Sequence, residues 1–197
     1  MPTALVTGGA VRLGRSIALH LAGRGYNIAL HYGSSRESAE QTAEETREFG
    51  VQCKTYCVDF TNFDSIPLLM DQVLADFNSI DLLVNSAANF IQKNLEETSN
   101  TELLETININ LMAPFILMRE FKHKVNNGLI INILDERLLR RVSTFGAYSV
   151  SKSALAHLTE LSAVSWGETI RVNGIAPGLI LPPSGSSDEY LINNAPN

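Results

Sequence analysis

The sequence predicts an α/β fold in which a doubly wound parallel sheet is covered by helices on both faces. Short apolar runs alternate with longer segments of helical periodicity along most of the chain, and this alternation is typical of right-handed βαβ units. The apolar runs are nearly continuous, as expected of strands that are buried on both sides. The chain has 197 residues, of which 45% are hydrophobic, so it can bury one sizeable core.

Each element follows from a local pattern. In the first helix, Leu13, Ile17 and Leu21 share one face before the glycines at 23 and 25 end it. The second helix is charged and amphipathic and stops at Gly50, whereas the fourth is long and interrupted at Pro114. The expected strands are residues 4–7, 26–32, 51–58, 80–84, 128–134 and 170–175, and the helices after the first are residues 35–49, 65–77, 101–124 and 147–165.

Composition excludes several classes of function. The formal net charge is −6 and no basic run is present, which argues against nucleic-acid binding. No apolar run approaches the roughly 20 residues that span a bilayer, and the first residues show no secretory signal, so we expect a cytoplasmic protein that binds no membrane. Cys53 and Cys57 lie in one expected strand, where we expect reduced and buried thiols. The histidines are scattered, and we expect no metal site.

The first strand-to-helix turn, Thr7 to Gly14, has the character of a phosphate cradle. Its glycines let the backbone approach a pyrophosphate, and the N-terminus of the helix offers free N–H donors. A tight turn without a ligand is the alternative. After the second strand, Ser34, Ser35 and Arg36 stand where an NAD-binding unit has a carboxylate. Hydroxyls and an arginine suit a 2′-phosphate, which favours NADP(H), although one serine is also expected to cap the next helix.

Tyr148 and Lys152 are the strongest chemical signal in the chain. Their i, i+4 spacing places them on one face of an expected helix. A tyrosine is a weak acid unless its anion is stabilised, so we expect the lysine ammonium to lower the pKa of the phenol. In the long helix, Pro114 cannot donate to the carbonyl of Asn110, which we expect to be free to bind a water.

These segments resemble the short-chain dehydrogenase/reductase family, which has a Rossmann-type fold. The resemblance covers Ala4 to about Leu181 and rests on the glycine turn, Asn85-Ser86-Ala87-Ala88, the tyrosine–lysine pair and the segment from Asn173 to Gly178. Within the family, the chain is similar to pteridine and dihydromonapterin reductases. Four features carry that finer likeness: Arg12 in place of a glycine, the His31-Tyr32 pair, Phe90, and Asp135 in place of the usual serine thirteen residues before the tyrosine.

The resemblance implies a role for each site residue. Implied catalytic residues are Asp135, Tyr148, Lys152 and Asn110; implied substrate residues are Arg12, Phe90, Asp135, Tyr148 and Pro177; implied cofactor-binding residues are Gly8, Arg12, Leu13, Gly14, Ser34, Ser35, Arg36, Asp59, Phe60, Ser86, Ala87, Tyr148, Lys152 and Gly178. For Asp59, a cap near Asn62 is an equal alternative to contact with adenine. For Asp135 and Phe90, the alternatives are a turn cap and an aromatic plug.

The implied reaction is reduction of a dihydropterin or dihydrofolate-like substrate by NADPH, with Tyr148 and Asp135 delivering the proton. A 3-oxoacyl-carrier-protein or general carbonyl reductase is the first alternative, and a non-catalytic NADP-binding sensor is the second. We expect residues 1–181 to form the NADP-binding domain and residues 182–197 to begin a mobile substrate loop or a truncated tail. The resemblance further implies a homotetramer, and a sheet that lacks the family's last helix and strand.

Overall fold

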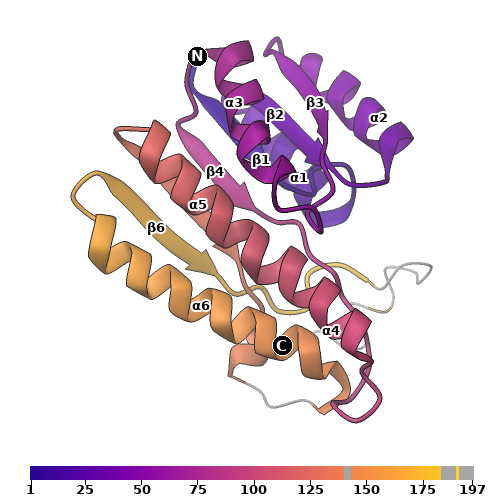
Figure 1. The fold of residues 1–197 in the computed structure, drawn as a ribbon. Helices are drawn as coiled ribbons and strands as arrows, with labels where there is room; N and C mark the ends of the chain where they lie inside the picture. Colours follow the sequence, from indigo (N-terminus) through magenta and orange to yellow (C-terminus); the bar gives the residue numbers. More distant parts are fainter. Residues whose placement is uncertain (140–142, 183–189, 191–197) are drawn as a thin grey trace.

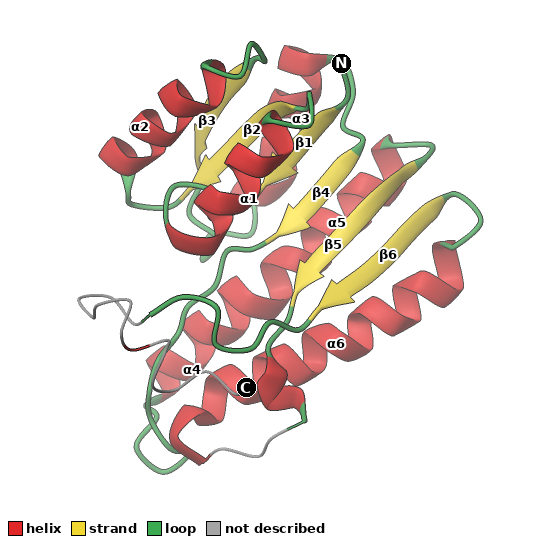
Figure 2. Ribbon diagram, turned by 180° about the vertical axis from the view of Figure 1, so that it is seen from behind, coloured by secondary structure: helices red, strands yellow, loops and turns green. Residues whose placement is uncertain are grey.

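The computed structural model describes residues 1–139, 143–182 and 190. Their six strands form one sheet in the order β3-β2-β1-β4-β5-β6, and every neighbouring pair is parallel (Figure 2). The predicted parallel α/β fold is therefore confirmed. The strand order reverses between β1 and β4, and in open α/β sheets ligands bind in the crevice at such a point. The strands are β1 (Thr3–Val6), β2 (Asn27–Tyr32), β3 (Cys53–Cys57), β4 (Leu82–Asn85), β5 (Gly128–Ile133) and β6 (Ile170–Ile175).

Helices cover both faces of this sheet, as Figures 1 and 2 show from opposite sides. On one face, α1 (Arg12–Ala22) and α2 (Arg36–Arg47) place mainly alanines against β1 and β2, so these helices approach the strands closely. On the other face, α3 (Ser65–Phe77) and α5 (Ala113–Lys124) bring larger side chains, including Leu69, Leu117 and Phe121, into a second core. The C-terminal half of α6 (Gly146–Trp166) packs on that same core.

The long fourth helix of the sequence prediction is wrong in detail. Residues 101–124 form not one kinked helix but α4 (Asn100–Ile107), a π-helical turn η1 (Asn108–Met112) and then α5, with Pro114 in the first turn of α5. Proline cannot donate to the carbonyl four residues earlier, and a wider turn before it changes the hydrogen-bond register. The N–H of Ala113 accordingly bonds to the carbonyl of Asn108.

The predicted burial of the two cysteines is confirmed for Cys53 and wrong for Cys57. Both are free, and Cys53 is buried among the residues under α2. Cys57 is exposed, and its thiol donates to the carbonyl of Gly33 at 3.2 Å. The reason is that β3 is an edge strand, so a side chain near its end lies beyond the covering helix. Among the described residues, no group of side chains has the composition of a metal site, and no helix combines the length and apolarity that crossing a bilayer requires.

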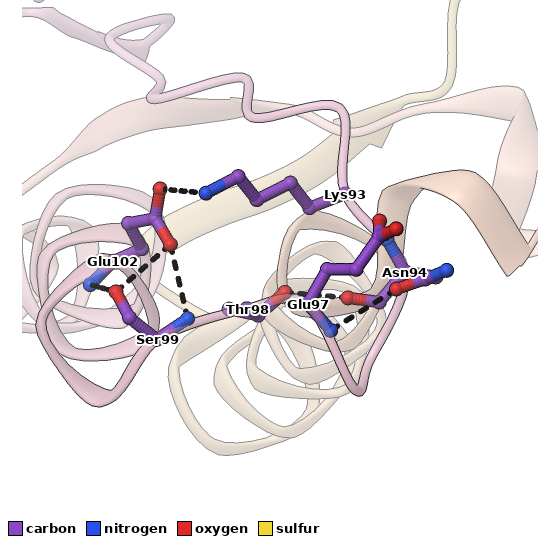
Figure 3. A network of polar contacts seen from close by, with 6 residues as sticks. All are labelled: Lys93, Asn94, Glu97, Thr98, Ser99 and Glu102. Atoms are coloured by element: carbon purple, nitrogen blue, oxygen red, sulfur yellow. Dashed lines mark hydrogen bonds and ion pairs between the residues drawn. The ribbon is translucent and has the colours of Figure 1, made fainter.

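A capping network fixes the start of α4 (Figure 3). The hydroxyl of Ser99 accepts from the N–H of Glu102, while the Glu102 carboxylate accepts from the N–H of Ser99 at 3.0 Å. Lys93 adds an ion pair to Glu102 at 2.6 Å. The loop between β4 and α4 is thereby tied to the helix, and the carbonyl of Lys93 accepts from the first residue of α6, Gly146, at 2.9 Å.

We expect Ser99→Ala to lower the free energy of unfolding by about 1 kcal/mol, the usual loss when an N-cap hydroxyl is removed. Urea denaturation followed by circular dichroism measures this loss. Thr101→Ala is the matched control, because Thr101 is exposed in the same first turn of α4 and its side chain takes no part in the capping box. Equal unfolding free energies for the two variants would show that the box contributes nothing.

Candidate active site

The first turn has the backbone shape of a phosphate cradle. Gly8 has a positive φ of +65°, and a Cβ there would lie 2.8 Å from the Cα of Ala87. A Cβ on Gly14 would collide with the carbonyl of Gly8. Helix α1 begins at Arg12 with no side-chain cap and no acidic residue in its first turn. The first N–H groups of this helix are therefore not bonded by a capping side chain and can donate to an anion. These residues fit the pyrophosphate of a dinucleotide.

Arg12 stands at this turn in a strained conformation. Its φ of +50° is one that glycine adopts freely and other residues rarely. Its Nη2 donates to the carbonyl of Pro182 at 2.9 Å. The arginine therefore joins the phosphate turn to the segment that follows β6, across the carboxyl edge of the sheet.

Side-chain contacts of His31 and Thr7, which sequence reasoning did not predict, hold this turn. The buried ring of His31 accepts from the N–H of Gly8 through Nδ1 at 3.2 Å, while its Nε2 lies 2.9 Å from the carbonyl of Val58. The Thr7 hydroxyl accepts from the N–H groups of Ser86 and Ala87 at 3.0 and 3.1 Å. A polar residue in an otherwise apolar strand was the signal for His31.

The carboxyl ends of β2 and β3 place the other expected cofactor residues. Ser34, Ser35 and Arg36 are exposed together at the start of α2. The expected cap is absent, because the N-cap Ser35 makes no side-chain bond to the helix, which leaves its hydroxyl for a ligand.

Asp59 accepts from the N–H and the hydroxyl of Thr61, both at 2.8 Å, and these bonds lower the pKa of its carboxyl. Its side chain thus stabilises the turn at Thr61, not a cap at Asn62. Phe60 is buried and stacks on His31 with ring centroids 4.0 Å apart. Only the backbone of Phe60 is therefore placed to meet a cofactor.

Three side chains of the expected catalytic set meet at the carboxyl end of β5. The hydroxyl of Tyr148 donates to Oδ2 of Asp135 at 2.9 Å, and the ammonium of Lys152 donates to the carbonyl of Ile133 at 2.7 Å. Both Tyr148 and Lys152 are buried on the first turns of α6. The i, i+4 spacing and the thirteen-residue separation therefore do place these groups in one site.

The protonation of the site differs from the expectation. Burial, and then the neighbouring Asp135 carboxylate, raise the pKa of Tyr148 instead of lowering it. The ammonium of Lys152 lies 5.8 Å from the centroid of the phenol ring and bonds to the backbone, so burial and the carboxylate at 2.9 Å together set the direction of the shift. Burial lowers the pKa of Lys152 to about 8. At neutral pH the phenol is a proton donor.

Arg137 is the site residue that sequence reasoning missed. Its Nη1 lies 3.1 and 2.9 Å from the two oxygens of Asp135, and its backbone N–H donates to Oδ1 at 2.8 Å. Its guanidinium lies over the rings of Phe145 and Phe90, at 4.4 and 5.4 Å from their centroids. The charge two residues after Asp135 was the available signal, but a contact at i+2 depends on the tight turn η2 (Glu136–Leu138).

Phe90 lies where a substrate residue was expected, but with aromatic partners of its own. It stacks on Phe145 with centroids 4.8 Å apart and meets the edge of Tyr148 at 4.7 Å. Phe90 is 53% exposed, so it is not a plug in the core. Phe145 belongs to the short turn η3 (Ser143–Phe145) just before α6.

Asn110 is fully buried in the π-helical turn, and its side chain positions the loop that carries Phe90. Its Oδ1 accepts from the N–H of Asn89 at 2.7 Å, and its Nδ2 donates to the carbonyl of Asn89 at 2.9 Å. The same amide donates to Ser151 at 3.0 Å, and Ser151 donates to the carbonyl of Tyr148 at 2.7 Å. These side-chain contacts of Asn110 are additional to the predicted role of its carbonyl in binding a water, which stays a prediction.

The segment after β6 closes the same edge of the sheet. The carbonyl of Pro177 accepts from the N–H of Glu136 at 3.1 Å, and Gly178 is exposed next to it. The expected residues Leu13, Ser86 and Ala87 border the first turn and the end of β4, while residues 183–189 and 191–197, part of the expected substrate loop, lie outside the described residues.

The fold and this site define a class of protein: a doubly wound nucleotide-binding domain with a tyrosine and a lysine at the crevice. Comparison with models of known protein families identifies one family within this class. A short chain dehydrogenase family model matches residues 2–189. The chain belongs to the short-chain dehydrogenase family, and it is an oxidoreductase.

Known relatives and solved structures agree with this assignment. The chain is 32% identical over 185 residues to 3-oxoacyl-[acyl-carrier-protein] reductase FabG of Staphylococcus aureus, which covers 91% of this chain and 74% of that protein. It is 32% identical over 176 residues to hydroxynaphthalene reductase arp2 of Aspergillus fumigatus, covering 88% and 64%. NAD+-bound xylitol dehydrogenase superposes with a TM-score of 0.85 at 30% identity, covering 92% and 71%. A dehydrogenase/reductase from Sinorhizobium meliloti gives 0.90 at 30% identity, covering 97% and 78%.

Proposed function

We propose that this oxidoreductase uses NADPH to reduce a C=N bond in a flat nitrogen heterocycle of the dihydropterin or dihydrofolate type. One observation carries the proposal: the acceptor Asp135 lies 2.9 Å from the buried hydroxyl of Tyr148. Reduction of a carbonyl places negative charge on oxygen, which a neighbouring carboxylate disfavours. A heterocycle that presents N–H donors turns the same carboxylate into a binding group.

When bound at the first turn, NADPH would supply the hydride that the carbon of the C=N bond needs. Tyr148 releases its proton to the ring nitrogen, so that hydride and proton together convert C=N into CH–NH. Asp135 accepts an N–H of the substrate, and the charged Lys152 offsets the phenolate that remains. The first turn and Arg12 would hold the phosphates, and Phe90 would pack on the flat ring.

A 3-oxoacyl thioester reductase is the second candidate. The 32% identity to a 3-oxoacyl-[acyl-carrier-protein] reductase favours it, and the names of the relatives favour it over the pterin substrate. Asp135 is the residue that separates the two candidates. It is a hydrogen-bond acceptor, and the carbonyl of a thioester offers it no N–H donor.

The deciding experiment is NADPH oxidation with dihydrobiopterin and with acetoacetyl-CoA, each at saturating and limiting concentration. The proposal predicts a higher kcat/KM for dihydrobiopterin, and loss of that advantage in Asp135→Ser, which restores a hydroxyl donor. Faster turnover of the thioester by the unchanged protein would replace the pterin proposal with the second candidate.

The exposed Ser34, Ser35 and Arg36 support a preference for NADPH over NADH. We expect Arg36→Ala to weaken NADPH binding about tenfold, which corresponds to the loss of one charge-assisted contact of about 1.4 kcal/mol. NADH binding should not change, because NADH lacks the 2′-phosphate. Fluorescence titration with both cofactors measures the ratio, and Arg24→Ala, an exposed arginine in the turn after α1, is the control. A parallel loss for NADH and NADPH would refute this placement of the phosphate.

A further inference from the structure

The Asp135 carboxylate is saturated by donors of its own chain. Oδ1 accepts from the backbone N–H of Arg137 at 2.8 Å and from Nη1 of the same residue at 3.1 Å. Oδ2 accepts from Nη1 at 2.9 Å and from the Tyr148 hydroxyl at 2.9 Å. A carboxylate offers about four lone-pair positions. A substrate N–H therefore reaches Asp135 only after one of these donors has left.

Of these donors, the guanidinium of Arg137 is the one that is free to move. The backbone N–H is fixed by the η2 turn, in which Leu138 bonds to the Asp135 carbonyl and Glu136 to the Pro177 carbonyl. Tyr148 is buried on the rigid helix α6. The Arg137 side chain is 27% exposed and hangs on several rotatable bonds.

The position of the guanidinium reveals the chemistry of the place it fills. It is a flat group that donates N–H bonds to a carboxylate whose side chain is only 13% exposed. Its carbon lies 4.4 Å from the centroid of Phe145, which stacks on Phe90. A carboxylate beside aromatic faces is suited to a planar nitrogen-rich group, because it supplies both hydrogen-bond acceptors and a π surface.

We propose that Asp135, Phe145 and Phe90 form a substrate subsite for a guanidine- or amidine-like edge, which the side chain of Arg137 fills until substrate displaces it. The ligand class is a flat, amino-substituted nitrogen heterocycle. A simple ketone or thioester has no N–H donors to replace those of Arg137, so Arg137 determines specificity by competing with every ligand for Asp135. The identity of the turned-over substrate rests on the proposed function, whereas the subsite itself is tested by binding alone.

The binding test uses isocytosine, a flat ring that contains a guanidine unit. Arg137→Met removes the guanidinium from Asp135 and keeps a flexible apolar side chain, so isocytosine should bind about fivefold more tightly than to the unchanged protein. That factor corresponds to about 1 kcal/mol, the upper range for a partly exposed ion pair. Adding Asp135→Asn should abolish the gain, and Arg24→Met is the control that leaves affinity unchanged. Calorimetry with and without NADP+ provides the affinities.

Kinetics give the second readout. Arg137→Met should lower KM for dihydrobiopterin about fivefold and leave kcat within about twofold. If instead kcat falls and millimolar guanidinium chloride restores it, Arg137 only positions Asp135 and the proposal is overturned. If Arg137→Met does not fold, as judged by circular dichroism, Arg137→Gln removes the same charge and should shift KM and affinity in the same directions.

The two proposals fail separately. A protein that binds isocytosine through Asp135 but reduces only the thioester would refute the proposed function and leave the subsite intact. A protein that reduces dihydrobiopterin while Arg137→Met binds isocytosine no better than the unchanged chain would refute the subsite alone.

Discussion

Tyr148→Phe should lower kcat by a factor of about 10² to 10⁴, the contribution of a positioned general acid. The hydroxyl is the only group removed, and it donates to Asp135 at 2.9 Å inside the site. Because the pKa of Tyr148 is raised above its ordinary value, the phenol is fully protonated over the neutral range. The substitution therefore removes a proton donor, and stopped-flow measurement of NADPH oxidation shows the loss directly.

The control for this prediction is Tyr26→Phe. This substitution removes a hydroxyl just before β2, at the amino ends of the strands and so at the opposite end of the sheet from the site. It should leave kcat unchanged. NADPH affinity should change little in either variant. A Tyr148→Phe protein that retains more than a tenth of kcat would show that another group, with Asp135 the nearest, delivers the proton.

The dependence of this rate on pH has a predictable sign. Lys152 loses its charge as the pH rises through about 8, because burial lowers its pKa to that value. The neutral amine no longer offsets a phenolate at Tyr148, so kcat should fall on the alkaline side, and Tyr148 itself should not limit the rate there. The expected alkaline limb therefore belongs to Lys152 rather than to the phenol, and Lys152→Gln should remove it.

The parts of the site that follow from spacing were predictable from sequence. Tyr148 and Lys152 share a helical face, and the carboxyl end of β5 brings Asp135 to them. The direction of the Tyr148 pKa was not predictable, because spacing shows which groups are neighbours but not where they point. Lys152 turns to the carbonyl of Ile133, and this contact exists only once β5 and α6 are packed.

The strands and their parallel orientation could be predicted, because continuous apolar runs need to be covered on both faces. Such runs can be recognised within each short segment of the sequence. The role of Arg137 depends on two other segments of the chain, since its guanidinium meets Phe90 from the loop after β4 and Phe145 from the turn before α6. The π-helical turn before Pro114 has a similar origin: the proline removes a donor, but the packing of Asn110 against Asn89 and Ser151 selects how the backbone adjusts.

Buried His31 makes the stability of the fold sensitive to acid. We expect protonation of His31 to lower the free energy of unfolding by about 3 kcal/mol between pH 6.5 and pH 4. Burial lowers the pKa of His31 to about 4 from an ordinary 6.5. In this window the unfolded chain binds a proton that the folded chain refuses, so stability is full above pH 6.5 and is lost as the pH falls through about 4. Protonation also removes the acceptor for the N–H of Gly8, which loosens the phosphate turn.

The measurement is the urea midpoint of unfolding at several pH values from 7 to 4.5, where the carboxyl groups contribute least. His31→Gln keeps an amide in place of the ring but cannot gain a proton, so its unfolding free energy should be lower at pH 7 and nearly flat over this range. His157→Gln is the matched control, since His157 is 70% exposed on α6, and it should follow the unchanged protein. If His31→Gln loses stability as steeply as the unchanged protein between pH 6.5 and 4.5, the acid sensitivity arises elsewhere and His31 is only a packed ring.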